Sequence, residues 1–161
     1  MAFVLSSPDI ASQATISAPF VYSGCGGGNR SPALRWSGAP AGTASFAVTV
    51  YDPDAPTGSG WWHWLIYNVP PNLGDLAPGA GSADGRHAPK GSAQGINDYG
   101  ERGYGGPCPP PGDRPHRYIF TVFALKLAHL DLPASATGAM IGFNLNAKVL
   151  ATASFTALYG R

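Results

Sequence analysis

The stretch "YDPDAPTGSGWWHWLIYNVP" at residues 51–70 decides the fold, because it joins the end of one strand to the whole of the next. The preceding run "SFAVTVYD" (45–52) and the later run "WHWLIYNV" (62–69) are rich in β-branched and aromatic residues. Both runs are almost continuously apolar, which is typical of strands that are covered on both faces. We therefore predict two central strands joined by a rigid turn.

Other segments extend this pattern to a mainly β fold. "RYIFTVFAL" (117–125) is a third strong strand, and weaker strand candidates are 3–7, 33–37 and 152–160. We expect a sandwich or barrel-like sheet with short peripheral helical turns, one of them near 91–100.

One late helix is predicted over residues 135–151. Met140, Phe143, Ala147 and Leu150 recur at spacings of three and four, which indicates an apolar stripe facing the core. Ser135 or Thr137 can cap its first turn.

Length and composition limit the classes of protein. The chain has 161 residues, of which 44% are hydrophobic, so we expect a single domain over 1–161. The net charge is +1 with no basic stripe, which argues against nucleic acid as a partner. No apolar run approaches the roughly 20 residues of a transmembrane segment, and the N-terminus lacks the features of a signal peptide. The sequence therefore predicts a cytoplasmic protein.

The two cysteines give no metal-binding pattern. Cys25 and Cys108 lie in separate Gly- or Pro-rich segments, and neither belongs to a CxxC pair. We expect two unrelated reduced thiols, because a disulfide would require these distant loops to meet.

Polar residues gather around the turn between the central strands. Asp52 ends the first strand, and Asp54 would point to the same side if strand geometry continued. The alternative is that both aspartates cap turns through bonds to nearby amides. His63 could be a core histidine, but the hairpin can return it to the level of Asp52, where a carboxylate would orient the imidazole and favour its charged form.

A second polar group occupies "GYGGPCPPPGDRPHRYIFTVFAL" (103–125). Glycines and prolines predict a rigid loop that leads into the third strand, where His116 and Tyr118 alternate to one face and Arg117 to the other. Imidazoles, a phenol and exposed amides suit a small oxyanion better than a metal.

With both groups considered, the sequence resembles the phosphatidylethanolamine-binding protein family, also called the Raf-kinase-inhibitor-like family, and its bacterial branch in particular. The resemblance rests on "YDPDAP", "WWHWLIYNVP", "GYGGPCPPPGDRPHRYIF" and "ATGAMIGFNLNAKVLATASFTALYG", and it extends from about residue 18 to the end. It implies a large central antiparallel sheet packed against a smaller sheet, with an anion pocket at one end.

The resemblance also implies which residues form the site. Its pocket would be formed by Asp52, Asp54, Pro56, His63, Gly106, Pro107, His116 and Tyr118. It further implies a cis peptide between Ala55 and Pro56, a homodimer and a protein partner such as a kinase.

The leading hypothesis is a non-catalytic binding protein without a cofactor. Its ligand would be phosphate, a phosphorylated headgroup such as phosphoethanolamine, or a small carboxylate, with His63 and His116 as hydrogen-bond donors that are charged when the anion is present. The alternative is a hydrolase or metal-dependent enzyme that uses Asp52, Asp54, His63 and His116. A third interpretation is an interaction domain whose tryptophans at 61, 62 and 64 contact a partner.

Overall fold

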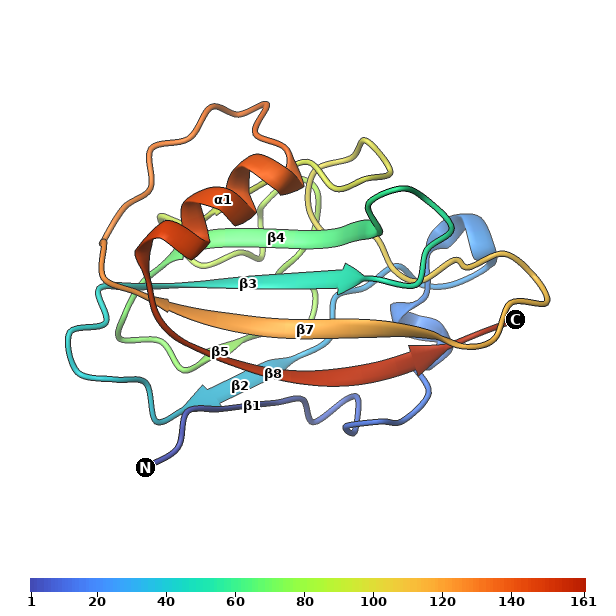
Figure 1. Cartoon of the computed structure of the whole chain (residues 1–161), viewed down its shortest axis with the longest axis horizontal. Helices are drawn as coiled ribbons and strands as arrows, with labels where there is room; N and C mark the ends of the chain where they lie inside the picture. The colour runs from blue at the N-terminus through green and yellow to red at the C-terminus, as the bar shows by residue number, and fades with distance from the viewer.

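The computed structural model describes residues 1–161 and contains two antiparallel sheets (Figure 1). The larger sheet has the strand order β6-β4-β3-β7-β8. Its strands are Ala93–Gln94 (β6), Trp61–Val69 (β4), Ser45–Asp52 (β3), His116–Leu125 (β7) and Val149–Tyr159 (β8). The smaller sheet is formed by Val4–Ser6 (β1), Leu34–Ser37 (β2) and Asp75–Leu76 (β5). The predicted mainly β fold, with a large sheet packed against a smaller one, is confirmed.

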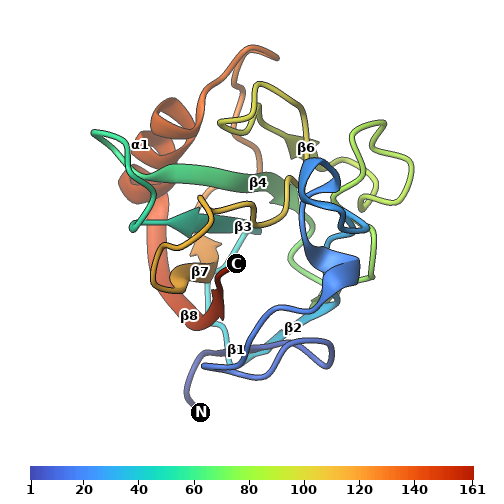
Figure 2. The same ribbon diagram turned by 90° about the vertical axis from the view of Figure 1, so that its right-hand side faces the viewer.

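The central strands are almost continuously apolar because the larger sheet is covered on both faces. On one face, Val48 of β3 and Phe120 of β7 join a core that includes Trp36 of β2. On the other face, Ala47 of β3 and Leu65 of β4 pack in a second core beneath the helix Gly138–Lys148 (α1). Figure 2 shows α1 and the smaller sheet on opposite sides of the larger one.

The predicted late helix is present as α1, but the face that it buries is not the predicted one. Thr137 caps α1, since its side chain accepts a hydrogen bond from the Met140 amide. The side chains that reach the core are Ile141 and Leu145, whereas Phe143 is 76% exposed and Met140 is 44% exposed. The predicted stripe is therefore wrong.

The long connection between residues 70 and 115 holds two short strands that the sequence did not reveal. β5 pairs with β2, and β6 pairs with β4 through Ile66 and Gln94. The helical turns are two 3₁₀ turns at Ala18–Phe20 (η1) and Ser23–Cys25 (η2). The turn expected near 91–100 is absent, because β6 lies within that segment.

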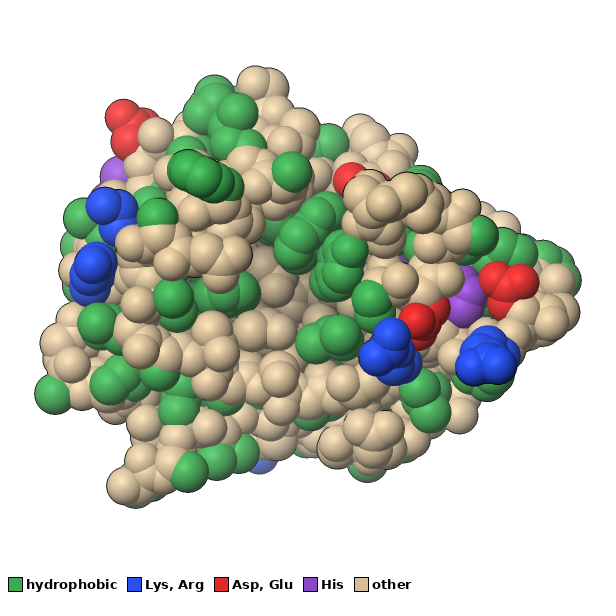
Figure 3. Space-filling view, in the orientation of Figure 1, with side chains coloured by type: hydrophobic (Ala, Val, Ile, Leu, Met, Phe, Trp, Pro, Cys, Tyr) green, Lys and Arg blue, Asp and Glu red, His purple; other side chains and the backbone are tan.

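One end of the larger sheet collects the polar segments. β3 ends there, β4 and β7 begin there, and the loops 53–60 and 105–115 and the C-terminus all lie at this end (Figure 1). In the space-filling view, acidic, basic and histidine side chains gather at this end, and a second such group lies at the opposite end (Figure 3). None of the helices is long and apolar enough to cross a membrane.

Candidate functional site

A cavity of about 300 Å³ opens at this end of the larger sheet. β3, β4 and β7 each contribute to its wall, through Asp52, His63 and the pair His116 and Tyr118 respectively. The turn 53–60 and the loop 105–115 complete it. Their lining residues are Ala55, Pro56, Thr57, Cys108, Pro109 and Pro110, and Trp61 and Tyr99 add aromatic surface.

His63 reaches the cavity because β4 is irregular at this point. Val50 pairs with Trp64 and Tyr51 pairs with Trp62, so His63 is the extra residue of a β-bulge. Bulges redirect side chains near functional sites. The ring of His63 packs edge-on against Tyr118, with 5.1 Å between the ring centroids.

His116 is held between two carboxylates. Its Nδ1 lies 2.7 Å from Asp52 Oδ2, and its Nε2 lies 2.9 Å from Asp113 Oδ2. A carboxylate only accepts, so this geometry suits a ring with protons on both nitrogens. Burial alone would lower the pKa of His116, but the two hydrogen bonds outweigh it, and the pKa is raised. His116 is therefore the cation of the site.

Asp52 performs both roles that the sequence left open. One oxygen accepts from His116, and the other, Oδ1, accepts from the Asp54 amide at 2.7 Å. The second bond closes a turn directly after β3, at the start of the connection that leads to β4. Asp52 therefore both caps the turn and orients the imidazole.

Asp54 does not reach the cavity. Its carboxylate accepts three hydrogen bonds from Arg117, from the backbone amide at 2.8 Å and from the guanidinium at 2.9 and 3.0 Å. The hydrogen bonds from Arg117 lower the pKa of Asp54 to about 2. The expectation that Asp52 and Asp54 point to one side is wrong, because strand geometry stops at Asp52.

His63 is neutral, although a carboxylate beside it was expected to favour its charged form, because its ring contacts a carbonyl instead. Its Nδ1 lies 2.7 Å from the Gly105 carbonyl oxygen, and a carbonyl cannot donate, so Nδ1 carries the proton. Burial lowers the pKa of His63 to about 4. Its other nitrogen, Nε2, therefore presents a lone pair at neutral pH and accepts hydrogen bonds.

Two buried donors beside the cavity have no partner within the protein. They are the Tyr118 hydroxyl and the Trp61 indole nitrogen. Tyr118 is 1% exposed, and burial raises the pKa of its hydroxyl, which stays protonated. Buried polar groups are nearly always paired, so two orphans at one cavity indicate a missing partner. Trp61 was not among the residues expected to form the pocket.

Gly106 and Pro107 support the wall without lining the cavity. The Gly106 amide donates to Asn29 Oδ1 at 2.8 Å, and its carbonyl accepts from the Tyr99 hydroxyl at 2.7 Å. A side chain at Gly106 would clash with the Phe20 carbonyl, which explains the glycine. The backbone amide of Gly106 is thus occupied by the protein.

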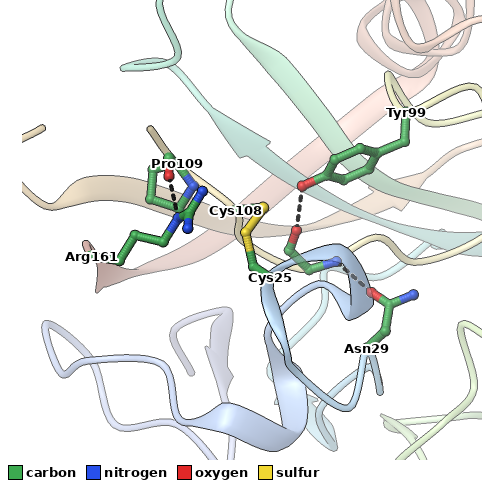
Figure 4. The surroundings of a disulfide bond; sticks show 7 residues. Cys25, Asn29, Tyr99, Cys108, Pro109 and Arg161 are labelled. Carbon is green, nitrogen blue, oxygen red and sulfur yellow. Dashed lines mark hydrogen bonds between the residues drawn. A yellow bond between two sulfur atoms is a disulfide. The ribbon is translucent and has the colours of Figure 1, made fainter. Parts of the chain in front are cut away.

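The two cysteines form a disulfide, which corrects the expectation of separate thiols (Figure 4). Their Cα atoms lie 5.7 Å apart, so η2 is fastened to the loop that lines the cavity. On the other side of this loop, Arg161 Nε donates to the Pro109 carbonyl at 2.7 Å. The loop 105–115 is therefore anchored at its adjacent residues Cys108 and Pro109 by two different segments of the chain.

Two further expectations concern backbone and metal chemistry. Every peptide bond is trans, including Ala55–Pro56, so the implied cis bond is absent although Pro56 lines the cavity. No group of three or more histidine, cysteine, aspartate or glutamate side chains is arranged to hold a metal ion. Asp52 and Asp113 instead both contact His116.

Known proteins resemble this chain over almost its whole length. A family profile described as Phosphatidylethanolamine-binding protein matches residues 6–160. The chain is 51% identical to YbcL of Escherichia coli over 160 residues, covering 98% of this chain and 87% of that protein. The crystal structure of YbcL, described as a new member of the mammalian PEBP family, superimposes with a TM-score of 0.98 at 49% identity, covering 100% of this chain and 99% of that one.

Two more distant relatives are informative. The structure of CT736 from Chlamydia trachomatis, a putative phosphatidylethanolamine-binding protein homologue, has a TM-score of 0.83 at 31% identity, and the match covers 99% of this chain and 98% of that one. The putative lipoprotein LppC of Mycobacterium tuberculosis is 41% identical over 134 residues, which are 83% of this chain and 60% of that protein.

Proposed function

The chain belongs to the phosphatidylethanolamine-binding protein family, and on that premise we propose that it is a non-catalytic binding protein whose cavity takes a small oxyanion. The observation that carries the proposal is the pair of unpartnered donors, Tyr118 and Trp61, at a cavity of about 300 Å³. That volume is at the lower end of small-molecule pockets and suits a phosphate or a short phosphorylated headgroup. The imidazole of His116 stands in the same wall, between the carboxylates of Asp52 and Asp113.

Calorimetric titration with inorganic phosphate tests the proposal. Wild-type protein should bind with a measurable affinity, and Tyr118→Phe should weaken binding about tenfold by removing one hydrogen bond to a charged ligand. Tyr67→Phe is the matched control, since Tyr67 is a buried tyrosine that does not line the cavity. No saturable binding by the wild type up to about 10 mM phosphate would refute the proposal.

The enzymatic alternative has less support. Cys108, the nearest candidate nucleophile, is bonded to Cys25. The four residues of that hypothesis do not converge, because Asp54 is paired with Arg117 outside the cavity. A binding role needs none of them as a nucleophile.

We further propose that the protein works in an oxidising compartment rather than in the expected cytoplasm. The disulfide supports this proposal, because such bonds persist where glutathione and thioredoxin do not reduce them. The resemblance of LppC, which is named a lipoprotein, is in keeping with it. Alkylation of free thiols in protein taken directly from cells tests the proposal, and two reactive thiols without added reductant would refute it.

A homodimer and a kinase-like protein partner, both implied by the family, stay predictions. Sedimentation at several concentrations tests the dimer, and a single monomer species throughout would reject it. Inhibition of a kinase is tested by adding the purified protein to a kinase assay.

A further inference from the structure

The free hydrogen-bonding groups at the cavity differ from those of a simple anion site. His116, the cation, has a carboxylate at each ring nitrogen, so neither of its N–H groups is free. The remaining polar groups are neutral: the Tyr118 hydroxyl and the Trp61 indole N–H, both buried without a partner, and Nε2 of His63, whose ring is hydrogen-bonded through Nδ1. Two of these groups donate and the third accepts.

The accepting nitrogen requires a donor on the ligand. Because Nδ1 of His63 is committed to the Gly105 carbonyl, a neutral ring can present only a lone pair at Nε2. A fully ionised oxyanion has no proton to offer, so its oxygen would face that lone pair at a cost. An oxyanion that keeps one hydroxyl can donate to His63 and accept from Tyr118 and Trp61.

The charges around His63 disfavour a second negative charge on the ligand. The facing groups are Asp52 from β3, His116 and Tyr118 from β7, and Asp98 and Tyr99 from the segment before β7. Asp113 lies on the far side of His116. At the imidazolium, two carboxylates therefore meet one positive charge, and a dianion would add to the excess of negative charge.

We propose that the cavity selects an oxyanion that carries one retained proton, namely the monoanion of a phosphomonoester, in preference to a dianion or a phosphodiester. This inference rests on the proposed function, since it names the ligand class of the same cavity. Phosphomonoesters lose their last proton with a pKa of about 6, so their affinity should fall as the pH rises past that value. A phosphodiester has no hydroxyl on phosphorus and cannot donate to His63 at any pH.

Methyl phosphate and dimethyl phosphate form a matched pair of probes. At about pH 5 both are monoanions, and only methyl phosphate has a hydroxyl on phosphorus. Calorimetry on the wild-type protein should show methyl phosphate binding at least tenfold more tightly at that pH, which is about 1.4 kcal/mol. The ratio of the two affinities should shrink as the pH is raised to about 8. At pH 5 both probes carry one negative charge, so the charge of His116 affects them alike, and the ratio at that pH isolates the hydroxyl on phosphorus.

Two variants locate the effect at His63. His63→Gln provides a side-chain amide that can donate as well as accept, so the preference for methyl phosphate should narrow and dimethyl phosphate should bind better than it does to the wild type. His129→Gln is the control, because His129 is exposed and does not line the cavity. It should leave the ratio unchanged.

The outcomes separate this inference from the function it rests on. If dimethyl phosphate binds as tightly as methyl phosphate, or if the ratio is constant with pH, the anion pocket stands and the selection by a retained proton is wrong. If methyl phosphate, dimethyl phosphate and sulfate all fail to bind, the proposed function itself is wrong and the inference falls with it. If His129→Gln changes the ratio as much as His63→Gln does, the assignment to His63 is wrong.

Discussion

Asp52 and His116 join the last residue of β3 to the first residue of β7 through a contact of 2.7 Å between Oδ2 and Nδ1. Both side chains are buried. A buried ion pair is costly to break, because the remaining charge is left without a partner. The contact therefore fixes the ring of His116 beside the cavity, and Asp113 completes its hydrogen bonding from the loop.

Asp113→Asn should lower the pKa of His116. The amide that replaces the carboxylate carries no charge, so the protonated ring loses one of the two partners that raise its pKa. Titration of the ring signals by NMR should place the wild-type pKa above about 6.5 and the variant's below the wild-type value. Asp131→Asn is the control, because Asp131 is an exposed residue beyond the far end of β7. A wild-type value below the ordinary one would contradict the description of the site.

The same pair predicts how stability depends on alkaline pH. Because the folded pKa of His116 is raised, its contribution is fully present below the unfolded value of about 6.5 and is lost as the pH rises through the folded pKa. His116→Gln should therefore lose more unfolding free energy, relative to wild type, at pH 6 than at pH 9. Urea denaturation at both pH values measures the difference, and an equal loss at both would show that the ring is not a cation in the folded protein.

His63 should have the opposite dependence. Burial lowers its folded pKa to about 4, so the unfolded chain binds a proton first, and the folded state loses stability as the pH falls from about 6.5 towards 4. The loss attributable to His63 is up to about 3 kcal/mol. Urea denaturation between pH 7 and pH 4.5 should show a smaller decline in His63→Gln than in the wild type. Equal declines in the two proteins would contradict the neutral assignment.

The sequence predicted the strands well and the site only in part. β3, β4 and β7 are continuous runs of β-branched and aromatic residues, and local pattern is enough to find such strands. Asp54 was misplaced because alternation applies only while the backbone is extended, and the turn after Asp52 ends it. Trp61 and Asp113 were not predicted as partners of the site, since their positions depend on how a hairpin and a distant loop meet.

The helix shows a different limit. Residues 138–148 contain two apolar pairs on different faces of the helix. Met140 and Phe143 are three positions apart and Ile141 and Leu145 are four apart, so each pair fits an apolar stripe. Sequence spacing identifies a stripe but not which stripe meets the sheet. The tertiary contacts of Ile141 and Leu145 with the second core decide it.

The orientation of α1 predicts how substitutions on its two faces change the free energy of unfolding. Leu145→Ala should lower the free energy of unfolding by about 2–5 kcal/mol, since it leaves a cavity against the sheet. Phe143→Ala, on the exposed face of the same helix, should change it by no more than about 0.5 kcal/mol. Guanidinium denaturation of both variants measures the contrast. A larger loss of unfolding free energy for Phe143→Ala than for Leu145→Ala would show that the stripe predicted from the sequence faces the core.

The disulfide should stabilise both the fold and the cavity wall. Cys25 and Cys108 are separated by 83 positions, so the bond closes a long loop in the unfolded chain. Chain entropy gives about 4.5 kcal/mol for a loop of this length. Reduction, or the double change of Cys25 and Cys108 to serine, should lower the unfolding free energy by an amount of this order. The serine variant should not respond to reductant, which separates the disulfide from other effects of the reagent.

Because Cys108 lines the cavity, the same variant should also bind phosphate more weakly than the wild type under the conditions of the calorimetric test. Unchanged affinity together with lowered stability would show that the contacts of Arg161 and Tyr99 hold the loop without the disulfide.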